Sequence, residues 1–88
     1  EEGPAKPDPS GVLEICSAFG VRPQETFVVG DYLFDLLCAR SAGAIAVWLR
    51  NSHAREDFSA SADYTIDTLP KILTIIESFD PHKEATNV

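Results

Sequence analysis

Two aspartates follow an apolar segment closely enough to share one binding site. The apolar segment 26–29 is followed directly by Gly30, then by Asp31 and, four residues later, by Asp35. A buried strand is expected to end here and a helix to begin, which is where open α/β sheets bind their ligands. The spacing puts both carboxylates on one side of the helix start. Two such oxygen donors suit Mg²⁺, which takes one or two protein carboxylates beside water and phosphate oxygens.

The same two acids also fit a structural role. Asp31 can cap the N-terminus of the following helix, and Asp35 can complement the helix dipole from the first turn. Spacing by itself favours neither the capped helix nor the metal site, so both interpretations stand at this point.

Basic side chains near these acids are few. Lys6 lies upstream in the loop Lys6-Pro7-Asp8-Pro9, and a lysine can neutralise a transferring phosphoryl group. A single loop lysine is ordinarily a solvated surface residue, so its value depends on the acids. His53 is interpreted as an exposed loop residue that could line the crevice mouth, and His82 is given no role.

Composition limits the class of protein. The 88 residues carry a net charge of −7, and they form one small domain at most. The absence of a basic stripe argues against nucleic acid, and the negative charge argues against an anionic membrane surface. The sequence contains no run of about 18 apolar residues, the length that a membrane-spanning helix needs. Cys16 and Cys38 are interpreted as small buried residues, which fits a reducing, intracellular compartment, either the cytoplasm or an organelle interior.

Helical and strand patterns alternate along the chain. Periodicity predicts helices over Ser10–Phe19, 33–42 and a last segment after Thr68, and strands over 26–30, 44–49 and 63–66. The polar stretch 50–62 is predicted to be a loop with a helical turn near Glu56. This order predicts an α/β fold with a parallel, Rossmann-like sheet of two to three strands and flanking helices.

Local signals place the helix ends and faces. Asp8 is expected to cap the first helix with Pro9 in its first turn, Gly20 and Gly43 to end the first two helices, and Thr68 to cap the last. Trp48 is expected to pack in the core or at the sheet end. Helical periodicity assigns to the apolar faces Val12, Leu13, Cys16 and Phe19 in the first helix, and Leu69, Ile72, Leu73, Ile76 and Phe79 in the last.

The strand 26–30 has no expected partner on one side. An open edge on a wholly apolar strand favours association with another chain segment. We therefore expect residues 1–80 to be the C-terminal part of a larger core domain, and 81–88 to be a frayed tail.

The order of these motifs resembles that of the haloacid dehalogenase-like (HAD) hydrolases, in particular their phosphoglycolate-phosphatase-like branch. The resemblance runs from about Lys6 to Leu73 and rests on the Lys6 loop, the segment 27–31, Asp35 and the segment 39–43. It implies Mg²⁺-dependent hydrolysis of a small phosphomonoester, in which an aspartate nucleophile forms an aspartyl-phosphate. It also implies that Asp31 binds Mg²⁺, that Asp35 supports the metal or its water ligands, and that Lys6 holds the nucleophile and the phosphoryl oxygens.

The sequence departs from the family pattern in two ways. Tyr32 replaces the small residue often found after the Gly-Asp pair, and no Asp-x-Asp-x-Thr/Val nucleophile motif occurs. We expect that motif, the motif-two Ser or Thr and the substrate-selecting cap domain to lie in the N-terminal half of a longer polypeptide. The absent central strand would then be the missing partner of 26–30. By itself the chain is expected to be inactive and to bind Mg²⁺ only at about millimolar level.

Two other functions remain open. A non-catalytic, truncated module would use its exposed sheet edge to associate with its own N-terminal half or with a second chain. A dehalogenase of the same superfamily is disfavoured, because the acid pair suits a metal that phosphoryl transfer needs and dehalogenation does not. The expected partners are thus a small phosphorylated substrate and a segment that completes the sheet.

Overall fold

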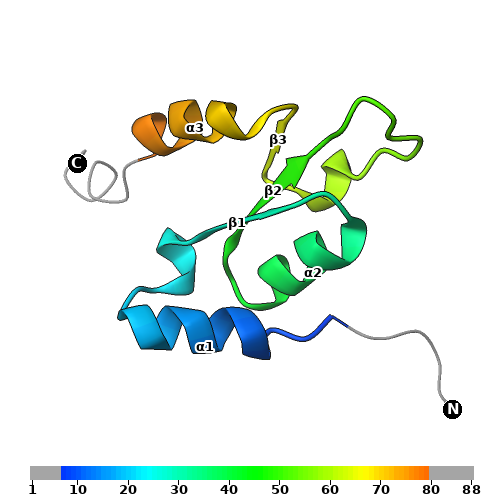
Figure 1. The fold of residues 1–88 in the computed structure, drawn as a ribbon. Helices are drawn as coiled ribbons and strands as arrows, with labels where there is room; N and C mark the ends of the chain where they lie inside the picture. Colours follow the sequence, from blue (N-terminus) through cyan, green and yellow to red (C-terminus); the bar gives the residue numbers. More distant parts are fainter. Residues whose placement is uncertain (1–6, 80–88) are drawn as a thin grey trace, which may run out of the picture.

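Three parallel strands form the centre of the fold (Figure 1). The computed structural model describes residues 7–79, and its sheet has the order β1 (Phe27–Gly30), β2 (Ile45–Leu49), β3 (Tyr64–Ile66). Both strand pairs are parallel, so the predicted α/β fold is confirmed. β1 has a neighbour on one side only within this sheet. The predictions for Lys6, His82 and the tail 81–88 lie outside the described residues.

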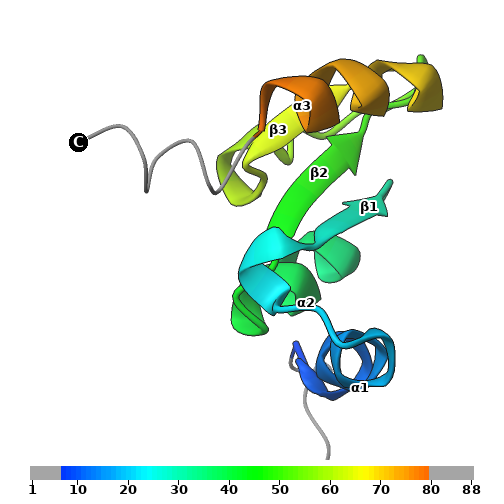
Figure 2. The ribbon, with the colours of Figure 1, turned by 90° about the vertical axis from the view of Figure 1, so that its left-hand side faces the viewer.

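Helices lie on both sides of the sheet. α1 (Ser10–Phe19) and α2 (Leu33–Ser41) lie on one side, and α3 (Ile72–Ser78) lies on the other (Figure 2). Neighbouring residues of β1 reflect this, because side chains alternate between the faces of a strand. Val28 packs against the α2 core, whereas the ring of Phe27 meets Phe79, which follows α3. No helix within residues 7–79 is long and apolar enough to cross a membrane.

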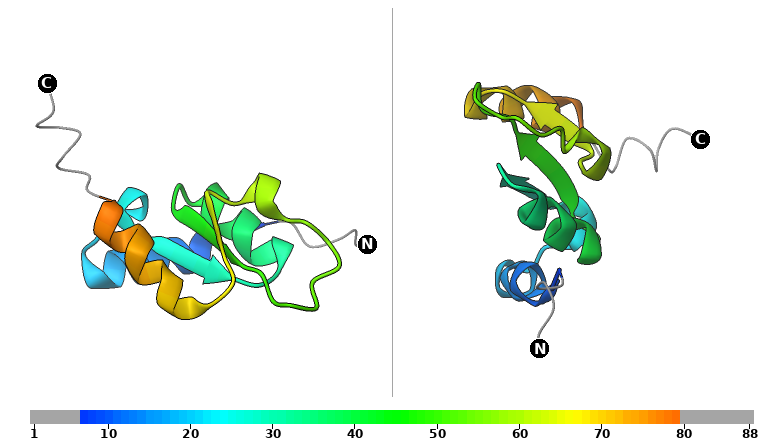
Figure 3. Two further views of the ribbon diagram at one scale, coloured as in Figure 1. Left: turned by 90° about the horizontal axis from the view of Figure 1, so that it is seen from above. Right: turned by 90° about the vertical axis from the view of Figure 1, so that its right-hand side faces the viewer.

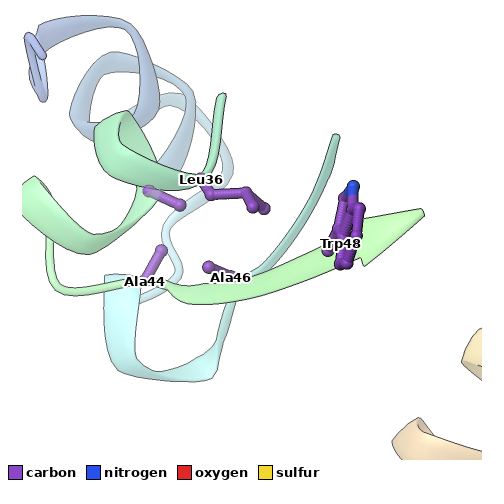
Figure 4. Packing of buried hydrophobic residues seen from close by; sticks show 5 residues of the cluster. Leu36, Ala44, Ala46 and Trp48 are labelled. Atoms are coloured by element: carbon purple, nitrogen blue, oxygen red, sulfur yellow. The ribbon is translucent and has the colours of Figure 1, made fainter. Parts of the chain in front are cut away.

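The buried core lies between α2 and the sheet (Figure 4). Its members are Leu36, Ala39, Ala44, Ala46 and Trp48. The small alanines let α2 approach the strands closely, and Trp48 fills the space at the carboxyl end of β2. Trp48 is 2% exposed, which confirms its predicted place in the core. Cys16 is also buried and Cys38 is half-buried, and both thiols are free.

The end of α1 follows the predicted signal, but at its start the N-cap position is held by Pro9 and not by Asp8. The Asp8 carboxylate accepts hydrogen bonds from the Ser10 N–H at 2.9 Å and from its hydroxyl at 2.6 Å. These bonds favour the charged carboxylate and lower the pKa of Asp8 below its ordinary value. At the other end Gly20 has φ 70°, and the Val21 N–H reaches the Cys16 carbonyl at 3.0 Å. This left-handed residue ends the helix as expected.

Some boundaries differ from prediction. α2 ends at Ser41 rather than at 42. Thr68 precedes the last helical segment but its side chain makes no capping hydrogen bond. The helical turn predicted near Glu56 is instead a 3₁₀ turn over Ser59–Ser61. It forms there because the Asp57 carboxylate accepts the Ser59 N–H at 3.0 Å and fixes the start of the turn.

The apolar faces predicted for the first and last helices are largely exposed within residues 7–79. Five of the predicted apolar side chains are exposed, namely Leu13, Phe19, Leu69, Leu73 and Ile76. Phe19 is 77% exposed and Leu73 60%. Periodicity identified the apolar side of each helix, but within residues 7–79 no element covers these side chains.

Candidate active site at the carboxyl end of β1

Asp31 and Asp35 occupy the junction between β1 and α2. Both are exposed, and neither makes a hydrogen bond or ion pair with another residue among those described. Tyr32, not Asp31, holds the N-cap position of α2, and no side chain makes the capping bond. The interpretation of Asp31 as the helix cap is thus wrong, whereas Asp35 does lie in the first turn of α2 as expected. Both carboxylates remain available for a cation.

Gly30 sets the position of the second acid. A Cβ built on Gly30 would lie 2.4 Å from the Asp35 Cβ and 2.9 Å from its Oδ2. The Asp35 side chain therefore lies directly against the Gly30 backbone, in space that any other residue would fill. This contact brings the Asp35 carboxylate back to the end of β1, beside Gly30, the residue that precedes Asp31.

The donor set fits a magnesium ion in part. No group of three or more His, Cys, Asp or Glu side chains gathers within the described range. Two exposed carboxylates are nevertheless what Mg²⁺ takes from many proteins, with water and phosphate oxygens completing its octahedron. The donors therefore fit the ion, provided that other oxygens complete the site.

A cavity of about 340 Å³ opens beside Asp31. Its remaining wall comes from Tyr32, from Trp48 of β2, and from the loop after β2, namely Asn51, Ala54, Arg55, Glu56 and Phe58. That loop projects from the carboxyl end of β2 (Figure 3). Parallel pairing of β1 and β2 brings these carboxyl ends to the same edge of the sheet.

Sequence reasoning missed the loop residues of this cavity. Asn51, Arg55 and Phe58 carry no motif, and the one available signal was their place after a buried strand. His53, which was considered for the crevice mouth, is exposed and is absent from the cavity wall. Its N–H donates to the Asn51 Oδ1 at 2.8 Å. The interpretation of His53 as an exposed loop residue agrees with this position.

Aromatic rings hold the loop against the site. The Tyr32 and Phe58 centroids lie 5.8 Å apart, edge to face, and those of Trp48 and Phe58 lie 5.4 Å apart. Such pairs add about 0.5–1.5 kcal/mol beyond area burial. Tyr32, the departure from the family pattern, thus contacts the loop through Phe58, while 62% of its surface stays exposed.

Comparisons with known proteins agree with this geometry. A haloacid dehalogenase-like hydrolase domain-containing protein of Arabidopsis thaliana is 37% identical over 81 residues, which are 85% of this chain and 33% of that protein. Glyceraldehyde 3-phosphate phosphatase of Pyrococcus furiosus is 35% identical over 80 residues, 86% of this chain and 33% of that protein. The chain thus spans about a third of the length of these relatives.

Solved structures share the fold. The crystal structure of a predicted phosphoglycolate phosphatase from Haemophilus somnus matches with a TM-score of 0.67 at 28% identity, over 84% of this chain and 34% of that one. This similarity confirms the resemblance to the phosphoglycolate-phosphatase-like branch. The family model of haloacid dehalogenase-like hydrolases matches residues 1–49. Since that match covers more than half of the 88 residues, the chain belongs to the haloacid dehalogenase-like hydrolases.

Proposed function

We propose that this chain is the C-terminal part of the core domain of a Mg²⁺-dependent phosphatase that acts on small phosphomonoesters. The observation that carries the proposal is the pair of carboxylates Asp31 and Asp35 at the carboxyl end of β1, which have no hydrogen-bond or ion-pair partner among residues 7–79. Family membership supports it, as do relatives named for the phosphatase activity on glyceraldehyde 3-phosphate and on phosphoglycolate.

The proposed chemistry divides between this chain and the rest of the polypeptide. An aspartate outside the 88 residues would attack the phosphorus and form an aspartyl-phosphate, which water then hydrolyses. Asp31 would hold the metal directly, and Asp35 would hold it or its water ligands. The bound metal supplies positive charge against the phosphoryl oxygens. The Lys6 ammonium would add a second positive charge and orient the nucleophile.

The open edge of β1 supports an origin in a larger domain. A strand from the N-terminal half of the polypeptide, or from a second chain, would pair with β1 and bring the nucleophile beside Asp31. The chain's small share of its relatives' length agrees with this arrangement. An intracellular location is proposed with it, because small phosphorylated metabolites and reduced thiols are found there.

The experiment is a phosphatase assay of the full-length polypeptide that contains this chain. Asp31→Asn should lower kcat at least about 100-fold, because metal stabilisation of the transition state is worth several kcal/mol. Chelation of the metal should have the same effect and added Mg²⁺ should reverse it. Asp67→Asn is the matched control, because Asp67 is exposed and pairs with Lys71 after β3. Unchanged turnover in Asp31→Asn would refute the proposal.

A second candidate is a non-catalytic module that associates through its sheet edge. Within residues 7–79 one edge of β1 has no neighbouring strand, and apolar side chains of α1 and α3 are exposed; both features favour this function. This function requires a stable complex with a strand added beside Val28. A folded monomer of the 88-residue chain at micromolar concentration would count against it, and Asp31-dependent hydrolysis by the full-length polypeptide would favour the phosphatase.

A further inference from the structure

Tyr32 is joined directly to the proposed metal ligand Asp31, and both residues line the same cavity. The backbone of Tyr32 is extended, with φ −132° and ψ 154°, and it holds the N-cap position of α2. The Cα atoms of adjacent residues are about 3.8 Å apart. A ligand bound at Asp31 therefore lies within reach of the Tyr32 side chain.

The Tyr32 ring is held in position by the core of the protein. It meets Phe58 at a centroid separation of 5.8 Å and an interplanar angle of 82°. Phe58 in turn packs against the buried core and lies 5.4 Å from the ring of Trp48, which is 2% exposed. Tyr32 is nevertheless 62% exposed, so among residues 7–79 nothing covers most of its surface. The result is an aromatic surface that is supported from one side and open on another.

The cavity wall combines this aromatic surface with a few polar groups. Half of the residues that line it are apolar or aromatic, namely Tyr32, Trp48, Ala54 and Phe58. Ligand cavities are typically lined in this way, with a small number of polar groups that fix the ligand's orientation. The volume of about 340 Å³ accommodates a group the size of one ring. One acid of the proposed metal site thus shares a cavity with a wall suited to an apolar group.

We propose that Tyr32 determines substrate specificity by binding the alcohol part of the ester, so that phosphomonoesters of apolar, ring-containing alcohols are favoured. The proposal rests on the phosphatase function proposed above. The phosphoryl group would bind at the metal held by Asp31, and the ring of the alcohol part would pack against Tyr32. Aromatic rings attract one another edge to face or in offset stacks, and contact between them removes apolar surface from water.

The test measures inhibition of the full-length polypeptide in Mg²⁺ by two phosphonates that it cannot hydrolyse. Benzylphosphonate and propylphosphonate both carry a CH₂ group in place of the ester oxygen, followed by a phenyl ring in the first and an ethyl group in the second. The ratio of their Ki values, measured on phenyl phosphate hydrolysis, reports binding of the ring and corrects for any general loss of binding at the metal. Benzylphosphonate should bind more tightly to the unaltered protein. Tyr32→Ala should reduce this advantage about 3- to 10-fold, the range expected for one aromatic contact.

Two further variants separate the ring of Tyr32 from other causes. Tyr32→Phe keeps the ring without its hydroxyl and should leave the Ki ratio unchanged. Tyr64→Ala is the matched control, because Tyr64 is 38% exposed, meets the ring of Phe27 at 6.3 Å and does not line this cavity. It should also leave the ratio unchanged.

The outcomes distinguish the subsite from the phosphatase function. An unchanged ratio in Tyr32→Ala would overturn the subsite, as would an equal fall in Tyr32→Phe or in Tyr64→Ala. Hydrolysis of 2-phosphoglycolate without hydrolysis of phenyl phosphate by the unaltered protein would overturn the subsite alone. Absence of Mg²⁺-dependent hydrolysis of both esters would overturn the function and the subsite with it.

Discussion

At the scale of single residues, Gly30 has to lack a side chain. The atom that a Cβ would meet first is the Asp35 Cβ, at 2.4 Å. This neighbour is the root of a side chain on the first turn of α2, so it cannot move aside without the helix. The requirement is steric, since the backbone of Gly30 does not adopt a positive φ.

Gly30→Ala should therefore destabilise the full-length polypeptide and displace the second acid. Overpacking of this kind costs about 1–3 kcal/mol, and the free energy of unfolding in urea measures it. Phosphatase turnover should fall as well, because Asp35 would move away from the strand end. Equal stability of Gly30→Ala and the unaltered protein would contradict the steric argument.

Gly11→Ala is the control for that change. Gly11 lies in α1, where a Cβ would meet nothing within 4 Å. Alanine favours a helix over glycine by about 0.5–1 kcal/mol. The control should therefore raise the free energy of unfolding and leave turnover unchanged, so the two glycine substitutions should differ in sign.

At the scale of elements, the loop between β2 and β3 is part of the site because its rings anchor it. Phe58 bridges Tyr32 before α2 and Trp48 of β2. The loop thereby joins the two strand ends that contribute to the cavity. A loop held only by its ends would leave this wall of the cavity without a fixed position.

Phe58→Ala should release this loop and expose the ring of Trp48 to solvent. Trp48 is the sole tryptophan of the 88 residues and is 2% exposed, so its emission should shift to the red in the 88-residue chain. Phe19→Ala removes the same ring from a site that is 77% exposed and should leave the emission unchanged. An unshifted spectrum in Phe58→Ala would show that the ring does not shield Trp48.

At the scale of the whole molecule, the chain has a core on one side of its sheet and open apolar surfaces elsewhere. β1 has one free edge, and large side chains of α1 and α3 are exposed. A chain of this size buries only about 60–65% of its unfolded surface even when its fold is complete. These surfaces are where the remaining two thirds of a relative's length would pack.

The 88-residue chain should consequently show no phosphatase turnover in Mg²⁺. Addition in trans of the N-terminal part that we propose for the polypeptide should restore activity, since it would supply the nucleophile and pair with β1. The same complementation with Asp31→Asn in this chain should fail. Hydrolysis by the chain alone that disappears in Asp31→Asn would prove this prediction wrong.

Much of the fold follows from local sequence. The continuous apolar runs predicted buried parallel strands, and β1 and β2 lie within one residue of the predicted bounds. Gly20 marked the end of α1, and Asp8 lies within one residue of the N-cap Pro9, because such signals act within a few residues. The apolar faces of α1 and α3 were identified correctly as apolar, but their burial depends on elements distant in sequence.

The sequence by itself determined the family, the order of the elements and the two acids at the end of β1. Each of these depends on short spacings that a helix or a strand converts directly into geometry. Only the tertiary structure decided that Asp31 is not a helix cap and that Arg55 and Phe58 lie beside it. Arg55 and Phe58 are both more than 20 positions from Asp31 in the sequence. Parallel pairing of β1 with β2 is what brings them to the same edge of the sheet as Asp31.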